Sequence, residues 1–436
     1  GEIPDNGIDD DGNGYTDDVY GWSFLGGADG QNVEHERLEV TRLVAACRAA
    51  EVPDPVCSDY EAAFDADRSR FLRQRDQIAP IYAQMASADS LLQARFPDAY
   101  DAADPEALDP GLDLEADQAR RMLVFYASQG ATMDDINAYM EYLSNRLQYA
   151  YNPDFDPRPI VGDDLADVTE RFYGNADVHG PDPSHGTGVA GLVAAVRGNE
   201  VGIEGVAPNT EAAASVRIMA VRAVPDGDEY DKDIANAIRY AVDNGAHIIN
   251  MSFGKGYSPD KSVVDEAAQY AAERGVLLVH ASGNSSKDLG DGGNFPTDVT
   301  LDGATISTWM EIGASSSDPA ALAAGFSNYG DAEVDLFAPG AEVTSLAPGG
   351  GVQTQNGTSF AAPVVAGVAA LVMAYVPELS AEEVREILLE SVTSFAETPT
   401  PTPGGETTVP FGTLSVTGGV VNAADAVRLA LERAGG

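Results

Sequence analysis

The residues with the clearest potential for chemistry are a serine and a histidine, each placed where a loop gives way to a helix of small residues. His185 stands in SHGTGVAGLVAAV and Ser359 in NGTSFAAPVVAGVAALVMAYV. A serine hydroxyl is a poor nucleophile at neutral pH unless an imidazole takes its proton as it attacks. The oxyanion that forms on the substrate also needs hydrogen-bond donors aimed at it beforehand. The pair therefore suggests covalent catalysis by Ser359, with His185 as its base.

The helix predicted after Ser359 is apolar along its whole length, with alanine and glycine where neighbours must approach closely. This composition is typical of a buried central helix, whose N-terminus would present Ser359. Pro363 is tolerated there only because the first turn of a helix needs no N–H donor at that point. The serine therefore occupies a defined place in the fold.

The elements that must position these residues begin at about residue 161, where short apolar runs alternate with helical stretches and glycine turns. The segments are RIMAVRAV, DIANAIRYAVDNG, HIINMSFG, VVDEAAQYAAERG and VLLVHASGN. Strand, helix, strand, helix, strand predicts successive βαβ units, hence a parallel sheet with helices on both faces. Ligands gather beyond the carboxyl ends of such strands, which here are SFG at 252–254 and SGN at 282–284.

Four segments resemble motifs of the subtilisin-like serine peptidases, the subtilase family. SHGTGVAG, HASGNSS, NGTSFAAP and FSNYGDAEVDLFAPG are similar to its histidine, oxyanion, serine and sheet-edge motifs. They follow the family's order and spacing over about residues 161–436. The resemblance implies a three-layer α/β/α fold with a mostly parallel central sheet. It also implies a serine endopeptidase that cuts proteins or peptides through an acyl-enzyme.

The resemblance also implies roles for individual residues. His185 would be the general base and then the general acid, and Ser359 the nucleophile. Asn284 would donate its side-chain amide to the oxyanion beside the backbone N–H of Ser359. The alternative for Asn284 is a turn asparagine that follows a glycine.

The strand end SFG resembles the family's substrate-binding strand, which pairs with an extended peptide and forms one wall of the pocket for the residue before the cut. The residues concerned are Ser252, Phe253 and Gly254. The alternative is an ordinary strand end. Gly188 departs from the family, whose members usually carry another histidine there. The remaining histidines receive no role: His35, His179, His247 and His280.

The third group of the family's triad is an aspartate at the end of an apolar strand, in an Asp-Ser/Thr-Gly turn ahead of the histidine motif. The opening GEIPDNGIDDDGNGYTDDVYGWSF resembles the stretch after that strand, so we expect the aspartate upstream of residue 1. Asp5 imitates the turn, but GEIP supplies no strand to hold its carboxylate against His185. In a subtilisin, removing this aspartate alone lowers turnover by about 3 × 10⁴-fold. We therefore expect the chain as written to be weakly active or inactive.

We predict three regions: an N-terminal part of the catalytic domain at 1–25, a helical insertion at 26–160 and the catalytic domain at 161–436. The insertion is charged, and its apolar residues fall at helical spacing, with Thr132 as a candidate helix cap. Near the C-terminus, ETPTPTPGGETT predicts an exposed loop and NAADAVRLALERA a final helix.

Two cysteines, Cys47 and Cys57, are close enough in sequence to bridge if the chain is exported, and equally able to remain free thiols. We favour the disulfide. The family resemblance implies a secreted or cell-envelope location. No apolar run reaches the roughly 18 to 20 residues needed to cross a bilayer.

The charge of the chain is strongly negative, with 70 acidic and 25 basic residues and a formal net charge of −45. This charge argues against nucleic acid and anionic membranes as partners. Only four residues are lysines: Lys232, Lys255, Lys261 and Lys287. A surface rich in carboxylate and poor in lysine suits concentrated salt, where self-repulsion is screened. An arginine-biased genome is the alternative explanation.

An acidic loop near the N-terminus resembles the opening of an EF-hand calcium loop. DDDGNGYTDD places candidate ligands at Asp9, Asp11, Asn13 and Asp17. Tyr20 stands where such a loop has its closing acid. A structural calcium ion and a solvated acidic turn both remain open, and catalysis by a serine needs no cofactor.

Two function classes compete with the peptidase. A pseudopeptidase would bind peptides or a pro-segment without cutting them, and the upstream sequence decides between the two. An esterase or lipase of the α/β-hydrolase type would need Gly-x-Ser-x-Gly with the histidine after the serine. Here GTSFA lacks the last glycine, and His185 precedes Ser359. A carboxylate-based serine peptidase without histidine is disfavoured by the His185 motif.

Overall fold

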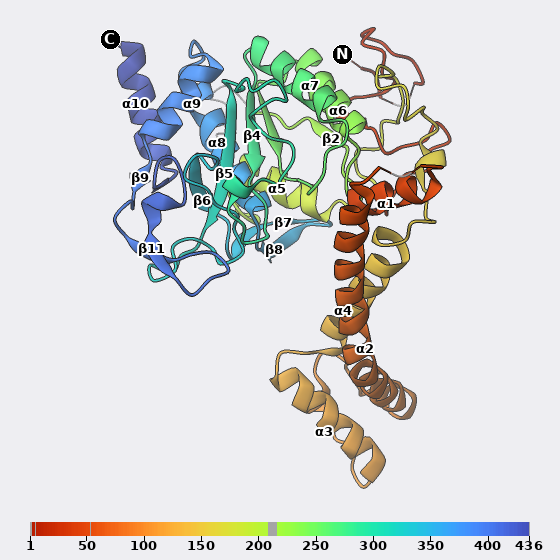
Figure 1. The fold of residues 1–436 in the computed structure, drawn as a ribbon. Helices are drawn as coiled ribbons and strands as arrows, with labels where there is room; N and C mark the ends of the chain where they lie inside the picture. The colour runs from red at the N-terminus through yellow and green to blue at the C-terminus, as the bar shows by residue number, and fades with distance from the viewer. Residues whose placement is uncertain (1, 5, 53, 208–215, 436) are drawn as a thin grey trace. The chain divides into compact units, whose positions relative to one another are not determined.

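The computed structural model describes residues 2–4, 6–52, 54–207 and 216–435. The chain divides into two compact units, one made of residues 1–34 and 157–436 and the other of residues 35–156 (Figure 1). The second unit is helical and falls inside the range 26–160 that we predicted for the insertion. Each unit is described separately below.

The larger unit is built on a sheet of six strands in the order β3-β4-β5-β6-β12-β9. Neighbouring strands from β3 to β12 run parallel, and β9 runs antiparallel to β12. The strands are β3 (Ile248–Met251), β4 (Leu277–Ala281), β5 (Trp309–Ser315), β6 (Leu336–Pro339), β12 (Gly419–Val420) and β9 (Thr393–Ser394).

Helices cover both faces of this sheet (Figure 1). On β4, Leu277 and Val279 belong to a core cluster with α8, α9 and α10, whereas Leu278 belongs to one with α6 and α7. Side chains of a strand alternate between faces, so the sheet lies between two helical layers. The helices are α5 (Ser184–Ala194), α6 (Asp231–Asp243), α7 (Lys261–Glu273), α8 (Thr358–Tyr375), α9 (Ala381–Glu390) and α10 (Ala423–Gly435). The predicted three-layer α/β/α fold and the final helix are confirmed.

Helix α8 corrects one expectation. It has 18 residues and is apolar enough to cross a membrane by length and composition, although we expected no run of this kind. In the larger unit, 67% of this window is buried, and its alanines and valines pack against the sheet. Here it is the central core helix that the sequence after Ser359 predicted.

Three pairs of strands lie outside the main sheet. They are β1 (Gly21–Ser23) with β2 (Ala220–Arg222), β7 (Val343–Ala347) with β8 (Gly351–Gln355), and β10 (Pro399–Pro401) with β11 (Thr408–Pro410). The last pair corrects the prediction of an exposed loop. Thr400 is fully buried in this hairpin and its hydroxyl accepts a hydrogen bond from the Ala323 N–H at 3.4 Å. Proline tolerates the edge of such a small sheet, which is why the composition was misleading.

One edge of β2 and one edge of β3 are unpaired among the described residues. All of β2 and the first three residues of β3 are only half-buried, whereas every residue of β4 and β5 is buried. Parallel strands are normally covered on both faces and paired on both sides. Helix α6 joins β2 to β3 in the sequence, as in a crossover between parallel strands.

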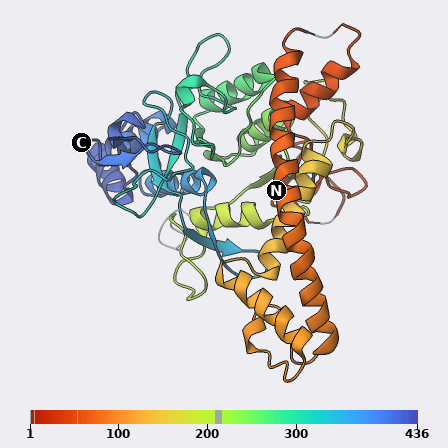
Figure 2. The same ribbon diagram turned by 60° about the horizontal axis from the view of Figure 1, so that its bottom comes forward.

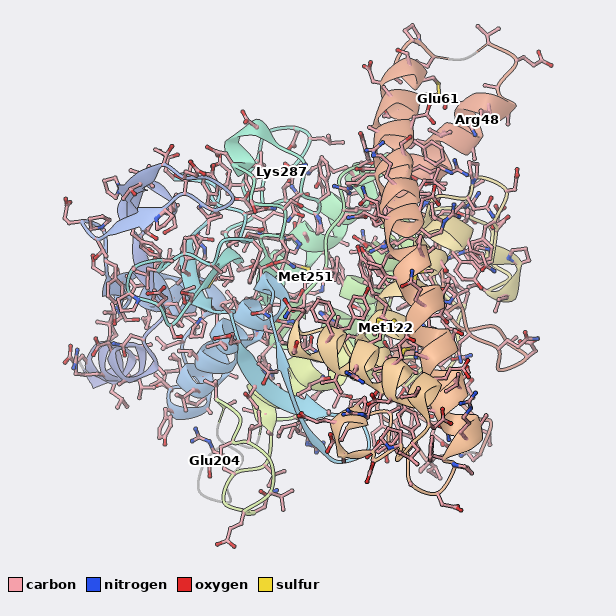
Figure 3. The ribbon with its side chains drawn as sticks, turned by 90° about the horizontal axis from the view of Figure 1, so that it is seen from below. Arg48, Glu61, Met122, Glu204, Met251 and Lys287 are labelled. Atoms are coloured by element: carbon pink, nitrogen blue, oxygen red, sulfur yellow. A yellow bond between two sulfur atoms is a disulfide. The ribbon has the colours of Figure 1, made fainter. Side chains whose placement is uncertain are left out.

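The smaller unit consists mainly of helices, of which α2 is the longest described (Figure 2). The helices are α1 (Glu39–Ala49), α2 (Cys57–Arg95), α3 (Leu114–Ser128) and α4 (Met133–Asn145). Thr132 caps α4 in a capping box with Asp135, as the sequence suggested. Cys47 and Cys57 form the disulfide that we favoured, beside the ion pair of Arg48 and Glu61 (Figure 3).

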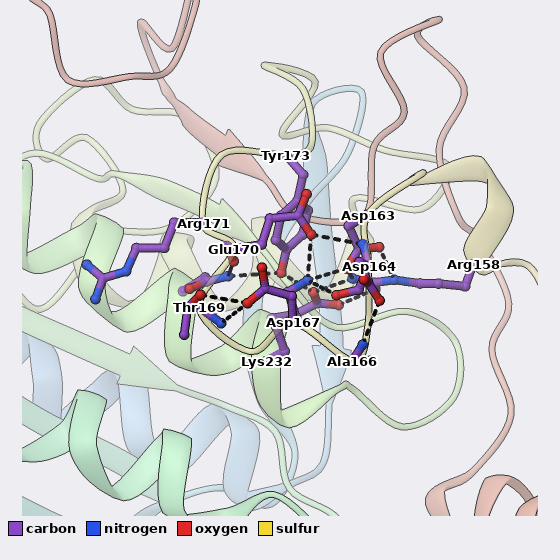
Figure 4. Close-up of polar contacts among 12 residues, drawn as sticks. Arg158, Asp163, Asp164, Ala166, Asp167, Thr169, Glu170, Arg171, Tyr173 and Lys232 are labelled. Carbon is purple, nitrogen blue, oxygen red and sulfur yellow. Dashed lines mark hydrogen bonds and ion pairs between the residues drawn. The ribbon is translucent and has the colours of Figure 1, made fainter.

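A buried polar network ties the segment after residue 157 to the start of α6 (Figure 4). Arg158 pairs with Asp163 at 2.6 Å and with Asp233 at 2.7 Å. Lys232 pairs with Asp163 at 2.8 Å, and the Tyr173 hydroxyl donates to Asp233 at 2.6 Å. Each buried charge has an opposite partner, which is the condition for tolerating it.

The four lysines divide unevenly between interior and surface. Lys232, Lys255 and Lys261 are only 4%, 5% and 9% exposed, and each pairs with a carboxylate. Lys287 is exposed. The surface of the protein therefore carries a single lysine side chain.

Candidate active site

Ser359 lies in the first turn of α8 and is tied to the end of β3. Its hydroxyl donates to the backbone oxygen of Ser252 at 3.3 Å. In return, the Ser252 hydroxyl donates to the backbone oxygen of Ser359 at 2.8 Å, and Asn250 donates to the Ser252 hydroxyl at 2.8 Å. The predicted substrate strand and the predicted nucleophile are therefore in direct contact.

His185 lies in the first turn of α5, and its ring meets the edge of the Phe360 ring at a centroid distance of 5.5 Å. Phe360 follows Ser359, so α5 and α8 bring the two candidate catalytic residues to the same place. Among the described residues, the Ser359 hydroxyl bonds to Ser252 and not to His185. The hydroxyl must give up its bond to Ser252 before His185 can take its proton.

Burial lowers the pKa of His185 below its ordinary value of 6.5, and the nearby Asp182 carboxylate opposes this shift. Part of the residue is nevertheless exposed to solvent. Asp182 itself accepts a hydrogen bond from the Ser184 N–H at 2.9 Å. No carboxylate is hydrogen-bonded to His185 in the part of the chain that the structure describes, and Asp5 lies outside that part.

Gly188 lies in α5 where the helix packs closely on its neighbours. A Cβ atom at this position would come within 3.1 Å of the Phe360 ring and 3.3 Å of the Gln353 amide nitrogen. That amide donates to the backbone oxygen of Ser184 at 3.1 Å. Glycine therefore leaves room for contacts that fix the start of α5.

Asn284 follows β4 and lies beside the first turn of α8. Its side-chain oxygen accepts from the Thr358 N–H at 2.9 Å and from the Thr358 hydroxyl at 3.0 Å. The Cβ position built on Gly357 is 3.4 Å from the Asn284 amide nitrogen and 3.6 Å from the Ser359 backbone nitrogen. Two N–H donors therefore flank one small space beside the serine.

The loop that carries Asn284 is held by Asn328, whose role sequence reasoning missed. The Asn328 side chain accepts from the Ser285 N–H and the Lys287 N–H, both at 3.0 Å, and donates to the Ser282 oxygen at 2.7 Å. Asn328 is 3% exposed. It lies in the FSNYG segment, and the asparagine there was the available signal.

The segment 252–254 continues β3 and packs closely on residues 294 and 295. A Cβ on Gly254 would lie 2.7 Å from the Asn294 side-chain oxygen, so a glycine is needed. Immediately after it, Lys255 and Phe295 exchange backbone hydrogen bonds at 3.0 and 2.9 Å. These contacts fix the far end of the segment.

His280 has specific partners, although we assigned it no role from the sequence. It is completely buried in β4, with Nδ1 2.8 Å from a Glu311 carboxylate oxygen and Nε2 2.8 Å from the Phe253 backbone oxygen. The available signal was a histidine inside the apolar strand VLLVHA. Of the other histidines, His35 stacks on Tyr149 in the smaller unit.

The acidic N-terminal loop brings together Glu2, Asp9 and Asp11, whose ligand oxygens lie within 4.8 Å of one another. Asp17 is not part of this cluster. The Asp17 carboxylate accepts two backbone N–H bonds, and the Asn13 side chain bonds to the Tyr15 N–H, Asp18 and Asn244. The predicted EF-hand arrangement is therefore only partly formed, and a hard cation would meet three carboxylates of a different set.

The chain is similar to known serine peptidases. A family model described as the subtilase family matches residues 135–413. The thermophilic serine proteinase of Bacillus sp. (strain AK1) is 38% identical over 221 residues, which is 50% of this chain and 48% of that protein. Subtilisin BL of Lederbergia lenta is 39% identical over 215 residues, 49% of this chain and 72% of that protein.

The chain spans about half the length of several curated relatives that it matches. Among solved structures, the prenylagaramide maturation protease PagA is 28% identical, with a TM-score of 0.45, and the match covers 57% of this chain and 83% of that one.

Proposed function

The chain belongs to the subtilase family of serine peptidases, and from this premise we propose that it is part of an endopeptidase that cuts proteins through an acyl-enzyme. We propose Ser359 as the nucleophile, His185 as the general base and then acid, and Asn284 as a donor to the oxyanion. The observation that carries the proposal is the shared space flanked by the Asn284 amide and the Ser359 N–H.

In this mechanism the substrate carbonyl oxygen enters that space. His185 takes the proton of the Ser359 hydroxyl as its oxygen attacks the carbonyl carbon, and the two N–H donors stabilise the resulting oxyanion. The tetrahedral intermediate collapses when His185 gives the proton to the leaving amine. Water then attacks the acyl-enzyme with the same base, and the acid product leaves Ser359.

We propose that the triad aspartate comes from a strand upstream of residue 1 that lies between β2 and β3. The unpaired, half-buried edges of these two strands support this position. The carboxyl end of a parallel strand there would lie at the same sheet edge as Ser252 and Ser282. A carboxylate at that end could orient the His185 ring and stabilise its protonated form.

Labelling of Ser359 by a fluorophosphonate probe tests the function. The chain as written is compared with a form extended upstream by its native sequence, with Ser359→Ala as the control. Strong labelling of the extended form alone supports the proposal, including the missing aspartate. If neither folded form labels, the peptidase proposal fails and a peptide-binding pseudopeptidase becomes the better account of the segment 252–254.

Location and partners belong to the same proposal. The Cys47–Cys57 disulfide supports an oxidising, extracytoplasmic location. We propose proteins or peptides as substrates and a pro-segment as a partner. Structural calcium at the N-terminal loop stays a prediction: Ca²⁺ titration should raise the melting temperature, and Asp9→Asn should remove the rise.

A further inference from the structure

We propose that His280 and Glu311 form a buried positioning pair that fixes the backbone of Phe253 and so aligns the strand that binds the substrate. This inference rests on the proposed function of residues 252–254. The two residues do not touch the reacting atoms. They act by fixing the backbone of residues 252–254.

The geometry of the pair follows from the register of the sheet. His280 of β4 lies between Met251 of β3 and Glu311 of β5 in the strand pairing. Its Nδ1 is 2.9 and 2.8 Å from the two oxygens of Glu311, and its Nε2 is 2.8 Å from the Phe253 oxygen. One imidazole ring therefore connects β5 to the strand end two residues beyond β3.

The hydrogen bonds dictate where the protons lie. A backbone oxygen can only accept, so Nε2 of His280 must carry a hydrogen. An ionised Glu311 also accepts only, so Nδ1 must then carry a second hydrogen, and the ring is an imidazolium. With a neutral ring, the second proton lies on the Glu311 carboxyl instead. In both cases the pair holds two protons, and the bond to Phe253 depends on both.

A pair that held only one proton could not keep both contacts. A neutral ring beside ionised Glu311 places its only hydrogen on Nδ1, facing the carboxylate. The lone pair of Nε2 would then face the lone pairs of the Phe253 oxygen at 2.8 Å. The peptide plane of Phe253 would turn away, and the neighbouring groups that pair with an extended substrate would turn with it.

Other polar groups pack around Glu311 and hold it in place. The Trp309 indole N–H donates to the Glu311 carboxylate at 3.0 Å. The backbone N–H of Glu311 donates to the Asp335 carboxylate at 2.8 Å. Asp335 pairs with Arg385 of α9 at 2.7 Å, and Asp298 interacts electrostatically with Glu311. Burial raises the pKa of Asp335 to about 6, and Arg385 opposes the rise.

The test uses two substrates of the full-length protein. A tetrapeptide p-nitroanilide needs the strand, whereas p-nitrophenyl acetate has no peptide to pair with it. We expect His280→Ala to raise KM for the peptide about tenfold, equivalent to about 1.4 kcal/mol. The value of kcat/KM for the acetate should stay within about twofold of wild type, because Ser359 and its donors are untouched.

His280→Asn is the second variant. Its short amide can still bond to Glu311 in place of Nδ1, but it has no atom in place of Nε2, so the bond to Phe253 is lost. We expect the same selective rise in KM. Two variants serve as matched controls. His247→Ala removes an exposed histidine, and Tyr173→Phe removes a remote buried hydroxyl. Both should leave KM and kcat for either substrate unchanged.

The outcomes separate this inference from the proposed function. If wild type hydrolyses neither substrate and Ser359 does not label, the peptidase itself fails. If wild type is active but both variants keep the wild-type KM for the peptide, the positioning role is overturned. An equal loss on both substrates in folded protein also overturns it. If His280→Ala does not fold, His280→Asn decides.

Discussion

At the scale of single residues, the candidate site depends on buried amides and hydroxyls that hold its donors in place. The Thr358 hydroxyl accepts from the Gly283 N–H at 3.0 Å and donates to the Asn284 oxygen at 3.0 Å. With its oxygen occupied twice, the Asn284 amide can only present its N–H groups to the space beside Ser359. Preorganised donors of this kind cost no rearrangement during reaction.

Asn328→Ala should lower kcat for peptide substrates by about tenfold and leave KM nearly unchanged, because a loosened loop misplaces the Asn284 donor. The measurement is steady-state kinetics of the full-length protein, with a double-mutant cycle. In an Asn284→Ala background, Asn328→Ala should cause little further decrease in kcat. Fully additive effects would contradict a role through Asn284. Asn236→Ala, at a remote buried asparagine, is the control.

In the chain as written, the rate of Ser359 labelling should fall on acidification only below pH 6.5, because burial lowers the pKa of His185. We call this fall the acid limb. Protonation removes the base, so labelling is lost as pH falls through that pKa. The upstream carboxylate should move the limb to higher pH, because it stabilises the imidazolium. The rate of labelling against pH measures both. A limb above 6.5 without the extension would refute the assignment.

At the scale of elements, α5 and α8 place His185 and Ser359, while β3 and β4 supply the substrate strand and the Asn284 loop. All four features lie at one end of the parallel strands. In the smaller unit, the disulfide joins Cys47 near the end of α1 to Cys57, the first residue of α2. It fixes the connection between the two helices.

Reduction of this disulfide, or Cys47→Ser with Cys57→Ser, should destabilise the smaller unit by about 2 to 3 kcal/mol, because the loop between the helices regains conformational freedom. Chemical denaturation followed by the far-ultraviolet helix signal measures the change. Ser58→Ala at the same helix end is the matched control. An unchanged midpoint after full reduction would show that the bridge does not constrain the unfolded chain.

Much of the larger unit could be predicted because its signals are local. Apolar runs of strand length, an alanine-rich helix and the motifs at 185, 284 and 359 each occupy a few adjacent positions. The partners of these motifs could not be predicted. His280 and Glu311 are 31 positions apart and meet only through the register of β4 and β5. Asn328 bonds to Lys287 and Ser282, which lie 41 and 46 positions earlier in the sequence.

The same limit applies at Thr400 and in the acidic loop. Thr400 is buried and bonds to Ala323, which is distant in the sequence, whereas the residues around it, rich in proline and threonine, indicate only exposure. The acidic loop formed its cluster with Glu2, outside the motif, because Asp17 is used for backbone N–H groups elsewhere in the loop. Hydrogen bonds to the backbone compete with any metal for such carboxylates.

At the scale of the whole molecule, the formal charge of −45 opposes compaction through repulsion among carboxylates. The structure adds that three of the four lysines neutralise buried acids, so they do little to balance the surface. Exposed acids therefore face mainly other acids, arginines and solvent ions.

The melting temperature should rise as KCl is increased to about 1 M, where the screening length falls to about 3 Å. Differential scanning calorimetry measures this, and equimolar sucrose provides the control for effects unrelated to charge. A rise in KCl well beyond that in sucrose supports adaptation to salt. A melting temperature that does not change with KCl favours the alternative, an acidic composition that comes only from an arginine-biased genome.

The uneven placement of lysines has a practical consequence for chemical conjugation. A reagent that acylates amines meets one exposed lysine side chain, Lys287, in the loop whose backbone is held by Asn328. Dyes, cross-linkers or solid supports attached through this amine would therefore all sit three positions from Asn284. A tether there would report directly on the ordering of that loop, and it would give immobilised molecules a common orientation.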